Sequence, residues 1–142
     1  MIRRLLLATL VLSLFAVAPA YAGELTVSNA WSRTTPPGVS VGVVYLKIYN
    51  DTAKSDRLLK LQASVASSAE VHRTEIVEGV ARMREVSVLH VAAGEHVEFA
   101  PGGMHVMLMG LKRPLVEGQK FDLELLFEVA GPRKVKVALR KP

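Results

Sequence analysis

The stretch VGVVYLKIYND, residues 41–51, is the part of the chain that indicates the fold class most directly. Its side chains alternate with a period of two, as in a β-strand, and both alternating sets contain apolar residues. Asn50 and Asp51 end the run with side chains that favour turns. The stretch therefore predicts a β-strand that carries apolar residues on both faces and is closed by a turn.

Other short runs of the same kind follow at intervals of about 8–12 residues, which is typical of a β-sandwich. They lie at residues 58–61, 69–76, 86–91, 95–99, 106–111, 120–129 and 134–139. Turn-forming residues separate them at 35–38, 78–79, 93–94, 101–103, 117–118 and 131–132. The one candidate for a helix after the N-terminal segment, residues 64–68, is too short to be stable by itself. We expect one all-β domain of seven to nine strands.

The N-terminal segment has the layout of a secretory signal peptide. Arg3 and Arg4 come first, an apolar run covers residues 5–18, and small residues lead to Ala22. The apolar run is shorter than the roughly 20 residues that a membrane-spanning helix needs. We expect a signal peptide at residues 1–22, cleaved after Ala22. Residues 23–142 would then be a periplasmic domain without a membrane attachment.

The composition excludes several classes of function. The net charge of +5 is spread along the chain and forms no basic block with interleaved aromatic residues, so nucleic acid is not an expected partner. The sequence has no cysteine, which excludes thiol nucleophiles, cysteine-based zinc sites and the histidine–cysteine site of blue-copper proteins. Glu70, Glu75 and Glu78 have no partner placed to form a general acid–base pair. We expect a binding protein and no enzyme.

Histidine and methionine are placed unevenly. The segment 101–109, PGGMHVMLM, holds His105 and Met107 two positions apart, so on a strand the two side chains share a face. His72 and Met83 flank a turn signal at residues 78–79, and a hairpin there would put them on adjacent strands. The four side chains could therefore converge at one end of a sandwich.

The chemistry of this set is selective. Thioether sulfur is a soft neutral ligand that suits Cu(I), and imidazole accepts several metals. The four residues include no carboxylate or thiolate, which makes them poor ligands for Mg²⁺, Ca²⁺ or structural Zn²⁺. Binding should weaken as the pH falls through the reference histidine pKa of about 6.5. The alternative is that methionines in strands fill the core and that the histidines lie on the surface.

Residues outside this set are assigned to packing or to the surface. Met104 falls on the opposite alternation from His105, and we expect it to pack or to form the rim of the site. We expect Met109 to lie in the core and Trp31 to be a core anchor. His90 and His96 lie in ordinary strand contexts and are not expected to bind metal.

The spacing His72, ten residues, Met83, twenty-one residues, His105, one residue, Met107 resembles the signature of the periplasmic copper(I) chaperone family. That family is associated with delivery of copper to the CuA centre of cytochrome c oxidase. The resemblance extends to residues 30–33, 35–38, 45–50, 56–58 and 101–108. It implies a cupredoxin-like (Ig-like) β-sandwich in which these four residues ligate Cu(I) near the surface.

Two departures from the family pattern limit the number of copper sites that we expect. Many relatives carry a second methionine two positions before the one at Met83, and this chain has Ala81 there. Some relatives end in a His/Met-rich tail, whereas this sequence ends at Arg140-Lys141-Pro142. We therefore expect one copper site per monomer.

Three functions remain open from the sequence. The first is a monomeric metallochaperone that passes Cu(I) to a recipient, such as the CuA domain of cytochrome c oxidase. The second is copper sequestration or resistance, in which the same site buffers copper without a dedicated recipient. The third is a structural or adhesion β-sandwich in which the methionine cluster is incidental.

Overall fold

The computed structural model describes residues 23–141, and their regular structure consists of β-strands. The expected signal peptide, residues 1–22, lies outside the described residues. The strands in chain order are β1 (Leu25–Arg33), β2 (Val41–Asn50), β3 (Asp56–Ala63), β4 (Ala66–Val77), β5 (Val80–Glu85), β6 (Leu89–Val91), β7 (His96–Glu98), β8 (Met104–Leu111), β9 (Lys120–Phe127) and β10 (Gly131–Arg140). Across residues 23–141, no helix has the length and hydrophobicity that a membrane span requires.

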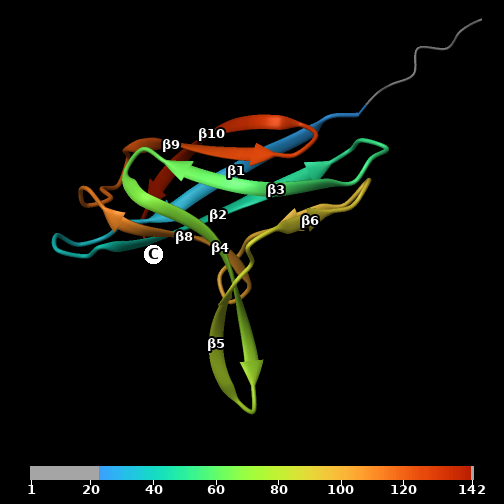
Figure 1. Ribbon diagram of the computed structural model, residues 1–142. Helices are drawn as coiled ribbons and strands as arrows, with labels where there is room; N and C mark the ends of the chain where they lie inside the picture. The colour runs from blue at the N-terminus through green and yellow to red at the C-terminus, as the bar shows by residue number, and fades with distance from the viewer. Residues whose placement is uncertain (1–22, 142) are drawn as a thin grey trace, which may run out of the picture.

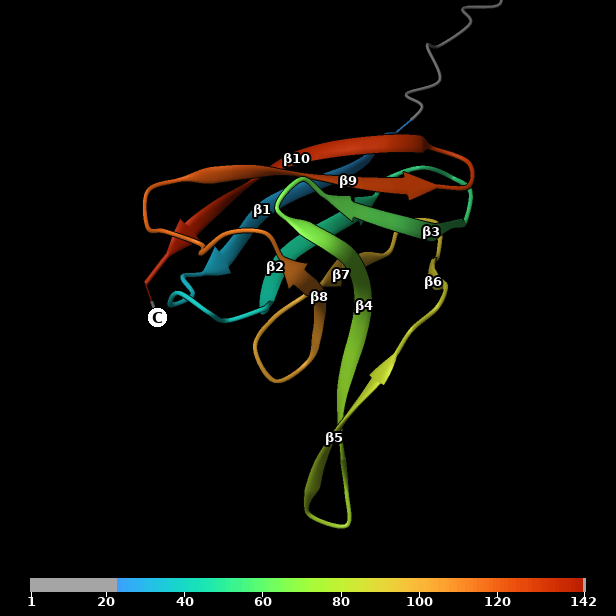
Figure 2. The ribbon, with the colours of Figure 1, turned by 60° about the vertical axis from the view of Figure 1, so that its left-hand side comes forward.

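The strands form a single sheet that closes on itself. Their order is β5-β4-β8-β2-β1-β10-β9-β3-β6, β7 pairs with β2, and a pairing of Leu61 with Ala69 joins β3 to β4. The pairing of β1 with β10 is parallel. In Figure 2, β3, β9 and β10 form one layer and β2, β8 and β4 lie beneath it. The fold is the cupredoxin-like (Ig-like) β-sandwich predicted from the sequence, with ten strands instead of seven to nine.

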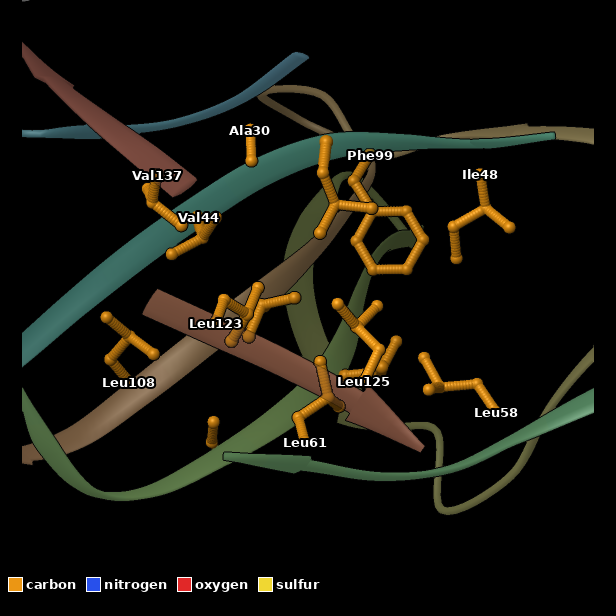
Figure 3. Packing of buried hydrophobic residues seen from close by; sticks show 14 of the residues in the cluster. Ala30, Val44, Ile48, Leu58, Leu61, Phe99, Leu108, Leu123, Leu125 and Val137 are labelled. Atoms are coloured by element: carbon orange, nitrogen blue, oxygen red, sulfur yellow. The ribbon is translucent and has the colours of Figure 1, made fainter. Parts of the chain in front are cut away.

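The core lies between the two layers and follows the period-two pattern of the strands. Along β9, every second side chain points inward and is at most 3% exposed, and β2 contributes a similar set. Figure 3 shows Leu123 and Leu125 of β9 close to Val44, Leu61 and Leu108 from β2, β3 and β8. These inward-facing residues of β9 and β2 are Phe121, Leu123, Leu125, Phe127, Val44, Leu46 and Ile48.

The prediction that Trp31 is a core anchor is wrong. Trp31 lies half-buried on the outer face of the sheet, where its ring centroid is 4.7 Å from that of Tyr45 and 5.6 Å from the guanidinium carbon of Arg140. The cause is a β-bulge between Ser28 and Trp31, where Asn29 takes a positive φ of 53°. The extra residue reverses the alternation of β1, so Trp31 faces outward.

A buried carboxylate ties β3 to the connection between β9 and β10. Asp56 is 4% exposed and accepts hydrogen bonds from the backbone N–H groups of Arg57, Val129 and Ala130 at 2.7–2.9 Å. Burial alone would raise the pKa of Asp56, but the backbone donors favour the charged form, and the pKa lies below its ordinary value of 3.8. Asp56 therefore stabilises the fold as an anion.

One hairpin projects from the sandwich and carries part of the predicted site. β4 pairs with β8 as far as Arg73, and the strand that pairs with it beyond this point, among residues 23–141, is β5, whose six residues are all exposed. Figures 1 and 2 show this β4–β5 hairpin extending away from the two layers. Its turn consists of Glu78 (φ 52°) and Gly79 (φ 77°), as expected for a two-residue type I′ hairpin. The candidate helix at residues 64–68 is absent, because residues 64–65 form a tight turn and β4 begins at Ala66.

Candidate metal site

The four predicted ligands lie on three neighbouring strands. His72 is on β4, Met83 is on β5, and His105 and Met107 are on β8. In the antiparallel register His72 stands directly opposite His105, Glu70 opposite Met107, and Thr74 opposite Met83. Directly opposed residues of antiparallel strands project to the same face.

All four predicted ligands therefore share one face of the β5–β4–β8 sheet. The opposite face of β4 and β8 carries Val71, Val106 and Leu108, which are buried in the core. The site face is thus the outer face of the sandwich, next to the base of the projecting hairpin.

The two histidines form the centre of this arrangement. Their ring centroids are 6.0 Å apart and the rings are inclined by 37°. A metal–nitrogen bond of about 2 Å, added to the roughly 1 Å from ring centroid to nitrogen, allows two imidazoles on one metal to lie up to about 6 Å apart. The observed separation lies within this limit, so the two rings are close enough to share one metal ion.

Hydrogen bonds fix which nitrogen of each ring carries the lone pair. Nδ1 of His105 is 3.2 Å from the carbonyl oxygen of Gly103, which can only accept, so Nδ1 carries the proton and Nε2 the lone pair. Nε2 of His72 is 3.1 Å from a carboxylate oxygen of Glu70, so Nε2 donates, and in the neutral ring Nδ1 carries the lone pair.

The Nδ1 atom of His72 is buried and has no hydrogen-bond partner among the residues that the structure describes. An unpartnered buried polar atom costs free energy, about 1–3 kcal/mol, and therefore calls for an explanation. A metal ligand must present an unprotonated imidazole nitrogen, and the other nitrogen of such a ring almost always donates to a carboxylate or carbonyl. His72 and His105 both meet this description, so their chemistry fits a bound metal.

The two methionines differ in how far they are enclosed. Met107 is half-buried on β8, two residues from His105, between Glu70 of β4 and Val43 of β2. Met83 is 59% exposed and lies diagonally from His72, whose direct partner on β5 is Glu85. The structure therefore brings His72, His105 and Met107 together on the body of the sandwich and places Met83 on the hairpin beside them.

Two of the remaining predictions concern methionines near the site. Met104 packs against the core on the opposite face, as expected, and its sulfur lies 3.8 Å from Nη2 of Arg73. The prediction that Met109 lies in the core is wrong. Met109 is half-buried on the site face, opposite the exposed Val41. Both faces of β8 are apolar, so the alternation of residue types does not indicate which one is inside.

The contact between Glu70 and His72 places one carboxylate beside the four predicted ligands, which themselves include none. The sequence does contain a signal for this contact, because residues 70 and 72 share a face of a strand. Within the described residues, no three histidine, aspartate or glutamate side chains are gathered closely enough to hold a metal ion by themselves. Met107 and Met83 supply two further donor atoms on the same face as the two histidines.

Comparison with known proteins identifies the family. The family model described as "LpqE-like: Putative lipoprotein LpqE-like" matches residues 25–139. "Putative lipoprotein Lxx21020" of Leifsonia xyli subsp. xyli is 33% identical over 120 residues, which cover 84% of this chain and 71% of that relative. The chain belongs to the LpqE-like family.

Solved structures agree with the fold. The copper-bound PCuAC domain from PmoF2 has a TM-score of 0.71 and 22% identity, over 85% of this chain and 96% of that domain. The Cu(I) form of DR1885 from Deinococcus radiodurans has a TM-score of 0.70 and 29% identity, over 87% of this chain and 83% of that protein. Both neighbours are described by bound copper.

Proposed function

We propose that this member of the LpqE-like family is an exported Cu(I) metallochaperone. Copper is its cargo, held by Nδ1 of His72, Nε2 of His105 and the thioether sulfurs of Met107 and Met83. The observation that carries the proposal is the buried, unpartnered Nδ1 of His72 on the same face as the His105 ring. The Cu(I) form of DR1885, which is 29% identical, supports the choice of metal and of its oxidation state.

The donor set suits a carrier better than a permanent metal centre. Neutral thioether and imidazole ligands stabilise Cu(I) without a coordinating anion. Three of the four donors belong to the packed β4–β8 pair, whereas Met83 is 59% exposed on a two-stranded hairpin. A soft ligand of a recipient protein can therefore replace Met83 first, before the histidines release the ion.

The expected recipient is a copper-binding protein outside the cytoplasm, and we propose the CuA domain of cytochrome c oxidase as the first candidate to test. Cleavage after Ala22, release into the periplasm as residues 23–142 and action as a monomer belong to the same proposal. A relative named as a lipoprotein supports export.

Copper binding is tested by anaerobic titration with Cu(I) against the chelator bicinchoninate. The His105→Ala variant should bind Cu(I) at least about 100-fold more weakly than the wild type, because it loses a nitrogen ligand from the centre of the site. His96→Ala is the matched control, since His96 lies on the surface and pairs with Asp51. Equal affinity of the wild-type and His105→Ala proteins would contradict the proposed site.

Delivery is tested separately, by mixing the Cu(I)-loaded protein with an apo CuA domain and following copper after the two proteins are separated. Movement of copper to the CuA domain supports the chaperone function. Retention of copper by a protein that binds it tightly would support sequestration instead, with the same site and no dedicated recipient.

A further inference from the structure

We propose that Glu70 is a positioning residue that selects Nδ1 of His72 as the copper-binding atom. This inference rests on the proposed function, because it assigns a role beside the copper site to a residue that is not itself a ligand. It also makes a statement about the metal-free protein that can be tested without copper.

The backbone places Glu70 where it can act on one histidine nitrogen only. Residues 70 and 72 share a face of β4, and Glu70 stands directly opposite Met107 of β8. Its carboxylate oxygen is 3.1 Å from Nε2 of His72, with side-chain exposures of 37% for Glu70 and 15% for His72. The carboxylate therefore contacts Nε2. The other ring nitrogen, Nδ1, is the one that is buried without a hydrogen-bond partner among the described residues.

The chemistry of the contact determines the tautomer. An ionised carboxylate has no proton to donate, so it is satisfied only by an N–H at Nε2. The opposite tautomer would set the Nε2 lone pair against a negative charge. It would also leave an N–H at Nδ1, in a buried position without an acceptor. Both effects favour the form in which Nδ1 carries the lone pair.

His105 shows the same principle with a different partner. Its Nδ1 donates to the carbonyl oxygen of Gly103, so the other nitrogen, Nε2, carries the lone pair. The backbone fixes the tautomer of His105, whereas a side chain fixes that of His72. Only the tautomer of His72 is therefore open to change by substitution of a side-chain partner.

A neighbouring carboxylate provides a matched control. Glu85 stands directly opposite His72 in the register of β4 with β5, and it is exposed on the same face. Among the contacts of the described residues, Glu85 makes no hydrogen bond or ion pair with His72. Removing its charge changes the local electrostatics as removal of Glu70 does, but leaves the hydrogen bond to Nε2 intact.

The experiment compares the wild type with Glu70→Gln, Glu70→Ala and Glu85→Gln. Long-range ¹H–¹⁵N NMR spectra of the metal-free, ¹⁵N-labelled proteins identify the protonated nitrogen of His72, and bicinchoninate competition measures Cu(I) affinity. Glutamine keeps the size of Glu70, but its amide can donate as well as accept, so it no longer enforces one tautomer.

We expect the wild type and Glu85→Gln to show the Nε2-protonated form of His72 and equal Cu(I) affinity. Glu70→Gln and Glu70→Ala should show a mixture of tautomers, with Cu(I) affinity lowered about 10- to 100-fold in Glu70→Ala and less in Glu70→Gln. An unchanged tautomer in both Glu70 variants would overturn the proposal. So would a Glu70→Gln protein that matches the wild type in both measurements, because Glu70 would then serve only in packing.

A failure of the proposed function would give different experimental results from a failure of the role proposed for Glu70. If the wild type binds no Cu(I), or if His105→Ala binds as tightly as the wild type, the copper site itself is wrong. The tautomer measured in the metal-free protein still decides whether Glu70 positions His72.

Discussion

The two methionines should contribute unequally to copper affinity, although both supply the same thioether. Met107 is half-buried between β4 and β2, whereas Met83 is 59% exposed on a hairpin whose outer strand, within the described part of the chain, pairs with β4 alone. Fixing a freely rotating methionine side chain costs up to about 1.5–2 kcal/mol. Met83 bears nearly all of this cost when it binds copper, while Met107 has already lost part of its freedom on folding.

The difference in ordering can be expressed as a ratio of affinities. A cost of 1.4 kcal/mol corresponds to a factor of about 10 in a binding constant. Met107→Leu should therefore weaken Cu(I) binding about tenfold more than Met83→Leu. Leucine is close to methionine in volume, so neither substitution should lower the free energy of unfolding by more than about 1.5 kcal/mol.

The assay is competition for Cu(I) against bicinchoninate under anaerobic conditions, combined with thermal unfolding of each metal-free variant. Met109→Leu is the control, because Met109 lies on the same face of β8, two residues beyond Met107. Its affinity should equal that of the wild type. A loss in Met83→Leu as large as that in Met107→Leu would refute the reasoning from exposure.

Three further predictions concern the fold that supports the site. Leu125→Ala should lower the free energy of unfolding by about 2–5 kcal/mol in a denaturant titration, because Leu125 is fully buried between the layers; a loss below 1 kcal/mol would mean that the core does not depend on this position. Gly79→Ala should weaken Cu(I) binding with little change in melting temperature. Gly79 has a φ of 77°, which is strained for any residue with a side chain, so alanine should disturb the turn that holds Met83. The added Cβ itself meets no neighbouring atom. Unchanged affinity would show that the turn geometry does not matter for the site. Asp56→Asn should make the free energy of unfolding less dependent on pH in the acid range. The folded pKa of Asp56 lies below 3.8, so its stabilisation is present above the unfolded pKa and is lost as the pH falls through the folded pKa. Unfolding measured between pH 2 and pH 7 should show the wild type more stable by about 1–3 kcal/mol near neutral pH and the two proteins converging in acid; parallel curves would contradict this role.

The sequence predicts the fold well wherever one face of a strand is apolar and the other is not. The strand predicted at residues 120–129 is found as β9, and its alternating apolar residues Phe121, Leu123 and Leu125 lie in the core. The period of a strand also predicts that His105 and Met107 share a face. This prediction does not depend on knowing which face of the strand is inward. The turn at residues 78–79 likewise predicts the hairpin that makes β4 and β5 neighbours.

The errors occur where the inward face of a strand is not known from the sequence. Met109 is assigned to the core and lies on the outer face, because both faces of β8 are apolar. Trp31 is misplaced because its assignment to the core rests on its residue type alone. No strand is predicted from the sequence at residues 25–33, and the bulge at Asn29 decides which face of β1 carries Trp31. The exposure of Met83 depends on where β8 stops pairing with β4, which is a property of the tertiary structure.

The contact of Glu70 with His72 also bears on the oxidation state of copper at the proposed site. The four donors are neutral, so bound Cu(I) adds one positive charge to the site and Cu(II) adds two. One carboxylate lies within hydrogen-bond distance of a ligand ring and balances a single charge. The attraction of this carboxylate is larger for the doubly charged ion than for the singly charged one, and Glu85 adds a second negative charge on the same face. The preference for Cu(I) that we propose therefore comes from the soft, neutral donors, and Glu70 acts on the orientation and tautomer of His72.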